Sequence, residues 1–180
     1  MKRKLLLGSL IALPVLVVGL YLFNAFNPLP ENPPLRHSGA LLSGDGDEVL
    51  RRACFDCHSN ETRYPWYSWL PGIGGLIGHH VREGREELNF SLWDQMRPSK
   101  RRKAVAESLE AVREGEMPQL GYTLLNPEAK LSGQDVAVLE QSAAQAYGKG
   151  ILKESRESGH DGERRKSRRR HDDDDDDDDD

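Results

Sequence analysis

Apolar residues recur at helical spacing through the middle of the chain, and no stretch alternates with period two for long enough to predict a sheet. In the segment 98–114, Val105, Leu109 and Val112 form one apolar stripe, and Gly115 is placed to end the helix. Similar patterns and end signals predict helices over 45–58 and 74–88, and one more that starts after Ser132 and ends at Gly148.

The longest apolar run lies at the amino terminus. Leu5 to Phe23 contains no charged residue and follows a basic flank, Lys2 to Lys4. At about 1.5 Å per residue, this run is just long enough to cross a bilayer core of roughly 30 Å. The residues 23–26 make a poor cleavage site, so we expect 1–26 to be an uncleaved signal-anchor in the inner membrane. The basic flank would keep that end inside, with the rest facing the periplasm or cell exterior.

Composition changes again on both sides of the central region. Residues 27–34 hold four prolines in eight positions, which favours a stiff linker, assigned here to 27–44. Residues 151–180 are highly charged and are expected to be a disordered tail, which leaves a folded domain over 45–150. Leaving out the nine aspartates of 172–180 changes the formal net charge from −5 to +4, so the acidic total says little about that domain. No nucleic-acid partner is expected.

The candidate chemistry lies in Cys54-Phe55-Asp56-Cys57-His58, which holds the only two cysteines of the chain. Positions i and i+3 of a helix share a face, so both thiols could reach the two vinyl groups at one edge of a porphyrin. His58 would then bind the iron from below. The pattern C-x-x-C-H is typical of covalent c-type haem attachment, which takes place outside the cytoplasmic membrane.

Three other interpretations of the cysteines compete. A redox disulfide pair favours a thioredoxin-like βαβ pattern, and none is visible in the sequence. A zinc site could use Cys54, Cys57, His79 and His80, but it lacks the second paired-ligand spacing of common structural sites. A structural disulfide across three residues has poor geometry within a helix.

An aromatic stretch follows the motif, and flat rings pack well on a macrocycle. The alternative is an ordinary hydrophobic core. The residues that we expect to line a haem pocket are Tyr64, Pro65, Trp66, Tyr67 and Trp69.

The runs ACFDCHSNETRYPWYSWL, HHVREGREELNFSLW and EGEMPQLGYTLLNPEAKLS resemble the bacterial haem-binding domain family of membrane-anchored, single-haem, c-type cytochrome-like proteins. The resemblance covers roughly 47–147 and implies a helical haem-binding domain, while it says less about activity. Family members usually have Asp at the position of His80, so His79 is the histidine that matches. The tail of arginines and aspartates is not part of the family pattern.

The sixth ligand of the iron is left open between several candidates. Met117-Pro118 follows the third predicted helix, and small cytochromes c often present a distal thioether from such a loop. Methionine and histidine ligation suits electron transfer. His79 is the main alternative, His80 is a weaker one, and an open or water-bound site is the last. Arg82 and Arg85 either pair with haem propionates or lie on a solvated helix face.

The sequence thus predicts an all-α protein, a small cytochrome c-like helical bundle around one covalent haem c, preceded by a single transmembrane helix. The expected function is one-electron transfer at the outer face of the cytoplasmic membrane, with a redox partner protein that the sequence does not name. The alternative functions are a haem-based peroxidase, a gas or redox sensor, and a zinc or thiol protein without haem. No constellation of catalytic acid, base and nucleophile is apparent, so the chain is expected to be an electron carrier.

Overall fold

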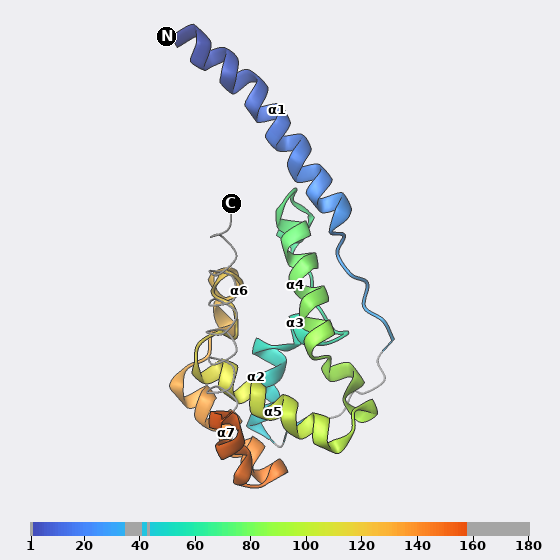
Figure 1. The fold of residues 1–180 in the computed structure, drawn as a ribbon, viewed down its shortest axis with the longest axis vertical. Coiled ribbons are helices and arrows are strands. Elements are labelled where there is room, and N and C mark those ends of the chain that lie inside the picture. The colour runs from blue at the N-terminus through green and yellow to red at the C-terminus, as the bar shows by residue number, and fades with distance from the viewer. Residues whose placement is uncertain (1, 35–40, 43, 158–180) are drawn as a thin grey trace, which may run out of the picture. The chain divides into compact units, whose positions relative to one another are not determined.

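The structure is a computed structural model that describes residues 2–34, 41–42 and 44–157. Within these residues all regular structure is helical, which confirms the predicted all-α class (Figure 1). The α-helices are α1 (Lys2–Phe26), α2 (Asp45–Ala53), α3 (Phe55–His58), α4 (Ile73–Glu87), α5 (Pro98–Arg113), α6 (Leu120–Leu125) and α7 (Gly133–Tyr147). The short 3-10 helices are η1 (Trp66–Trp69), η2 (Phe90–Gln95) and η3 (Pro127–Ala129).

The chain forms two compact units in place of the single cytochrome c-like bundle that the sequence predicted. The first unit takes its described residues from 1–36 and 55–91, and the second takes them from 37–54 and 92–180. Each unit is therefore built from two separate segments of the chain. A helical pattern cannot reveal such a division, because it reports which face of a helix is buried and not which partner covers that face.

The first unit is organised around α4, which α1, α3 and η1 all contact. Val81 of α4 is almost fully buried, and Phe55 and Phe90 are buried in the same unit. The segment 27–32 is not a detached linker, because Arg82 of α4 donates hydrogen bonds to the Pro28 carbonyl at 2.7 Å and to the Asn27 side chain at 2.8 Å.

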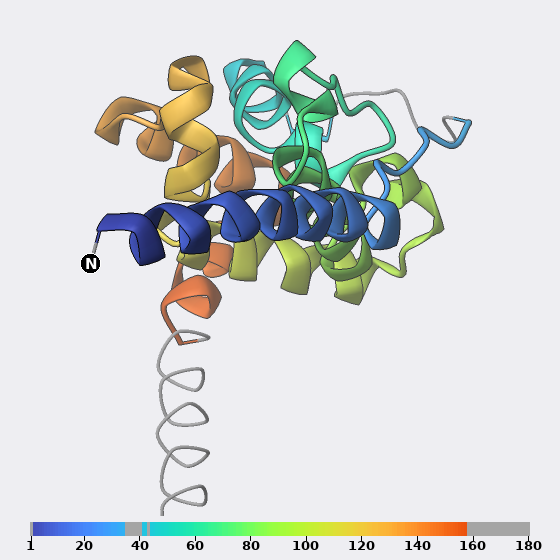
Figure 2. The ribbon, with the colours of Figure 1, turned by 90° about the horizontal axis from the view of Figure 1, so that it is seen from above.

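Helix α1 is continuous from Lys2 to Phe26, as Figure 2 shows, and its last turns pack against the start of α4. The Asn24 side chain accepts hydrogen bonds from the Gly72 and Gly75 amides, both at 2.8 Å. A Cβ atom on Gly75 would stand only 2.6 Å from the Phe23 ring. The end of the apolar run is thus occupied by contacts with protein.

The predicted transmembrane helix is wrong. In the part of the chain that the structure describes, no helix combines the length and the apolar character needed to cross a membrane.

The second unit has α7 at its centre, in contact with α2 and α5. Leu139 and Ala143 of α7 are buried, as are Ala106 and Leu109 of α5. The predicted capping box opens α7: the Ser132 hydroxyl accepts from the Asp135 amide at 3.2 Å, and the Asp135 carboxylate accepts from the Ser132 amide at 2.8 Å.

The structure confirms the predicted helices over 74–88, 98–114 and 133–147 within a residue or two at each end. The predicted helix 45–58 is instead two helices, α2 and α3, with a break at Cys54. Residues 151–157, assigned to the charged tail, lie in a helix that begins at residue 150, and Ile151 is fully buried. The remainder of that predicted tail, 158–180, lies outside the described residues.

Candidate haem-binding site

The C-x-x-C-H motif lies where the chain passes from one compact unit to the other. Cys54 ends α2, and its amide donates to the Leu50 carbonyl at 2.8 Å. Its φ of −122° leaves the helical range, and α3 then carries Cys57 and His58. The expectation that both cysteines share one face of a single helix is therefore wrong. No disulfide joins Cys54 to Cys57 in the structure.

The His58 ring is held from one side by the backbone. Its Nδ1 lies 3.1 Å from the Leu88 carbonyl oxygen. A carbonyl oxygen can only accept, so Nδ1 carries the proton and donates it. This contact fixes the tautomer and the orientation of the ring, and it leaves Nε2 as the nitrogen for a metal. A proximal haem ligand needs this arrangement, so the oriented His58 ring is suited to bind haem iron.

Two phenylalanines form an apolar wall beside the His58 ring. Phe55 and Phe90 stack with their ring centroids 5.3 Å apart, and both are buried. The Phe90 ring meets His58 edge-on at a centroid distance of 6.3 Å. Aromatic surface of this kind suits a flat apolar cofactor better than a hydrated metal ion.

Cys57 has the character of a buried thiol. The pKa of Cys57 is raised to about 11, mainly by burial and in smaller part by the Asp56 carboxylate, while Arg85 acts in the opposite direction. Reactive redox cysteines have lowered pKa values, so this environment argues against a thiol-redox role. Among the described residues, no group of three or more His, Cys, Asp or Glu side chains is placed to hold a metal ion.

Helix α4 approaches Cys57 through a glycine. A Cβ atom on Gly84 would stand 2.7 Å from the Cys57 carbonyl oxygen and 3.2 Å from the Cys57 Cβ. By helix propensity alone, Gly84 is a residue that weakens α4. A glycine inside a helical pattern is, however, the signal that marks such close approaches of two backbones.

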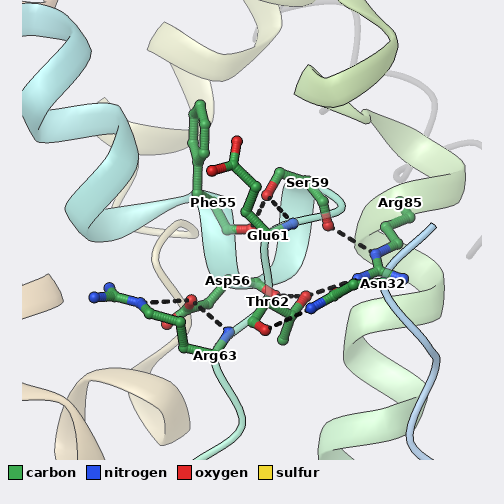
Figure 3. A network of polar contacts seen from close by, with 8 residues as sticks. All are labelled: Asn32, Phe55, Asp56, Ser59, Glu61, Thr62, Arg63 and Arg85. Atoms are coloured by element: carbon green, nitrogen blue, oxygen red, sulfur yellow. Dashed lines mark hydrogen bonds and ion pairs between the residues drawn. The ribbon is translucent and has the colours of Figure 1, made fainter. Parts of the chain in front are cut away.

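The residues directly after the motif close the end of α3. The buried Ser59 hydroxyl donates to the Phe55 carbonyl at 2.7 Å, and the Thr62 hydroxyl donates to the Asp56 carbonyl at 2.7 Å (Figure 3). Helices end with carbonyl groups that lack intrahelical partners, and these two hydroxyls satisfy such groups. Arg85 holds the same loop from α4, with its Nε donating to the Ser59 carbonyl at 2.8 Å.

Asn60 joins this loop to the segment that also holds His58. Its amide donates to the Ser91 hydroxyl at 2.9 Å, and its side-chain oxygen accepts from Asn89 at 2.9 Å. The segment 88–91 therefore contacts the motif at two points, through the Leu88 carbonyl and through these polar side chains. No local pattern in the sequence indicates this role, because the partners lie about 30 positions away.

The structure places the predicted aromatic pocket residues in different surroundings. Tyr64 is half-buried and donates to the Pro30 carbonyl at 2.6 Å. Trp66 and Trp69 are 76% and 73% exposed. Trp66 and Tyr67 meet edge-on at 5.9 Å, and Pro65 precedes them as the residue before η1.

The two leading candidates for the sixth ligand lie in different units. Met117 belongs to the second unit, where its amide donates to the Ala111 carbonyl at 3.1 Å and its side chain is partly exposed. His79 belongs to the first, on α4, where its Nε2 lies 3.1 Å from the Glu83 carboxylate. The neighbouring His80 is half-buried.

A helical protein that fixes the histidine of a C-x-x-C-H motif through Nδ1 beside stacked aromatic rings belongs, as a class, to the haem-binding proteins. The sequence profile of the family described as Haem-binding domain matches residues 32–145. This match covers more than half of the chain, so the chain belongs to that family and binds haem. No curated protein and no solved structure matches the chain.

Proposed function

We propose that the chain carries one haem c, attached through Cys54 and Cys57, and that it transfers single electrons. His58 would bind the haem iron through Nε2. The observation that carries this proposal is the hydrogen bond from His58 Nδ1 to the Leu88 carbonyl, because it orients the imidazole and leaves Nε2 for the iron. When bound, the haem would supply one-electron redox chemistry.

Residues around the motif would hold the haem and shield it from water. Gly84 allows α4 to lie against Cys57, and Phe55 with Phe90 excludes water beside His58. The loop 59–62 is hydrogen-bonded to carbonyl groups of α3, and these bonds hold the end of that helix in one conformation. Electron transfer is favoured by a site that changes little between its two oxidation states, and these contacts support such rigidity.

We further propose Met117 as the sixth ligand, with His79 as the alternative. A methionine thioether gives a higher potential than a second imidazole, which suits an electron carrier. The Nε2 atom of His79 is engaged with Glu83 within α4, and this contact favours Met117. Haem of this type is attached outside the cytoplasm, so we propose an extracytoplasmic location and a redox partner protein there.

The test of covalent attachment uses the full chain, produced together with a c-type maturation system. The denatured protein should retain haem on a gel, and its pyridine haemochrome spectrum should show two thioether bonds. Cys57→Ala should give the spectrum of a single thioether, and the double variant with Cys54→Ala should lose covalent haem altogether. Purified protein with stoichiometric zinc and no haem would overturn the proposal.

The test of the sixth ligand compares Met117→Ala with His79→Ala. The unaltered ferric protein should be low-spin, with a weak near-infrared charge-transfer band from sulfur to iron. Met117→Ala should remove that band, lower the potential and admit carbon monoxide to the ferrous form, whereas His79→Ala should change none of these. If only His79→Ala converts the protein to high spin, the ligand is His79. An unaltered protein that is high-spin and binds carbon monoxide rapidly would replace electron transfer with a peroxidase or sensor function.

A further inference from the structure

Arg85, on α4, donates four hydrogen bonds, and two of them go to the loop that follows the motif. Its guanidinium donates to the Ser59 carbonyl at 2.8 Å and to the Thr62 hydroxyl at 2.8 Å, which both follow α3 (Figure 3). It also donates to the Glu31 carbonyl at 2.7 Å and to the Asn32 side-chain oxygen at 2.6 Å. Four hydrogen bonds from one planar group hold its position closely.

All four acceptors of Arg85 are neutral. Within the described residues, no carboxylate pairs with it, whereas Arg102 and Arg113 each reach a glutamate, at 2.8 Å and 2.6 Å. Burial lowers the pKa of Arg85, but an arginine stays protonated in a protein. The group is therefore a half-buried positive charge that its four hydrogen bonds hold in place.

This charge lies beside the haem-attachment segment. The Arg85 Nε donates to the carbonyl oxygen of Ser59, which is the residue directly after His58. Asp56, the other charge beside Cys57, has a counter-charge of its own, since the Arg63 guanidinium lies 3.6 Å from its carboxylate.

We propose that Arg85 raises the reduction potential of the haem. Reduction adds one electron, donated by the redox partner, and converts ferric to ferrous iron without making or breaking a bond. A positive charge held nearby favours the state with less positive charge on the iron. For unit charges about 10 Å apart at an effective dielectric constant of about 20, the ratio of reduced to oxidised haem changes by roughly tenfold. That ratio corresponds to about 59 mV for one electron.

The main test introduces a counter-charge without removing Arg85. Asn32→Asp keeps an oxygen acceptor for the guanidinium and places a carboxylate where the neutral amide oxygen now lies, at 2.6 Å. The matched control is Asn27→Asp, which places the same carboxylate beside Arg82. Arg82 also has neutral partners, but these are Pro28 and Asn27, which do not belong to the loop that follows the motif. Spectroelectrochemical titration at low salt gives the potential of each holoprotein.

We expect Asn32→Asp to lower the ratio of reduced to oxidised haem several-fold at a fixed potential, and Asn27→Asp to leave it within twofold. Arg85→Gln should lower it by about tenfold, and Arg85→Lys, which keeps the charge, should retain most of the original value. If Asn32→Asp does not fold, as judged by its circular dichroism, the reduction potentials of Arg85→Lys and Arg85→Gln decide whether the charge of Arg85 raises the potential.

Equal potentials for Arg85→Gln and the unaltered protein would overturn the inference. An equal fall of the reduction potential in Arg85→Lys and Arg85→Gln would also overturn the inference, because the hydrogen bonds of Arg85 and not its charge would then set the potential. The inference rests on the proposed function, and the two failures are distinguishable. Covalent haem that is redox-active in every variant preserves the proposed function whatever the potentials are, whereas its absence from the unaltered protein rejects that function.

Discussion

Gly84 provides a direct test of how α4 positions the haem-attachment motif. In the variant Gly84→Ala, the new methyl carbon would stand 2.7 Å from the Cys57 carbonyl oxygen and 3.1 Å from its carbonyl carbon. Both atoms belong to the backbone, so no side-chain rotation can relieve the contact. Either α4 or α3 must move.

The expected loss combines two opposing terms. Overpacking of a close contact costs about 1–3 kcal/mol. Replacing glycine by alanine within a helix returns about 0.5–1 kcal/mol, because the unfolded chain loses less conformational entropy. We therefore expect the free energy of unfolding to fall by about 1–2 kcal/mol. The shift of Cys57 should also reduce the fraction of chains that carry covalent haem.

The assay is denaturant-induced unfolding followed by far-ultraviolet circular dichroism, together with haem staining of equal amounts of denatured protein. The control is Gly121→Ala in α6, where an added Cβ would meet nothing within 4 Å. That variant should be neutral or slightly more stable, with full haem attachment. If Gly84→Ala gains stability to the same extent as the control, the close approach of α4 to Cys57 does not exist and the reasoning fails.

Three further predictions concern the ends of helices. Asn24→Ala should lower the free energy of unfolding by about 1–2 kcal/mol, because the Gly72 and Gly75 amides lose their acceptor. Asn24→Asp keeps an oxygen at this position, so its free energy of unfolding should fall by less in the same denaturation assay. Ser132→Ala should cost about 0.5–2 kcal/mol through loss of the α7 cap, and a loss that Ser132→Thr fails to restore would contradict this account. Hydrogen bonds from the Ser132 backbone and side chain lower the pKa of Asp135 in the folded protein. The carboxylate therefore contributes its full stability above about pH 4, the pKa of an aspartate in the unfolded chain, and this contribution is lost as pH falls through the pKa of Asp135 in the folded protein. Asp135→Asn should flatten that part of the acid-denaturation curve, and a curve unchanged by the substitution would be evidence against it.

Much of the local structure could be predicted from the sequence. Helices α4, α5 and α7 follow from apolar spacing and from signals at their ends, such as the capping box at Ser132 and the glycine at position 148. These signals act over at most a few residues, and the energies involved are those of one helical turn. The C-x-x-C-H motif is local in the same way, and so it indicated haem before any tertiary contact was known.

The site itself depends on contacts that no local pattern carries. The carbonyl that orients His58 comes from Leu88, 30 positions away, and the side chain that closes the start of α4 comes from Asn24 in α1. Arg85 could be assigned from the sequence only to a haem propionate or to solvent, whereas the structure engages it with neutral oxygens from two other segments. Each of these partners is a backbone carbonyl or a common polar side chain, whose type alone does not distinguish it from many others in the chain.

What the sequence determined by itself is therefore the helical class, most helix boundaries and the identity of the cofactor, because each depends on residue types at fixed short spacing. Only the tertiary structure decided that the chain divides into two units, that the motif helix breaks at Cys54, and that α4 supports Cys57, Ser59 and the loop that follows. The physical reason is that hydrogen-bond acceptors and apolar surfaces are interchangeable along the sequence. Which of them meet is settled by the packing of whole helices against one another.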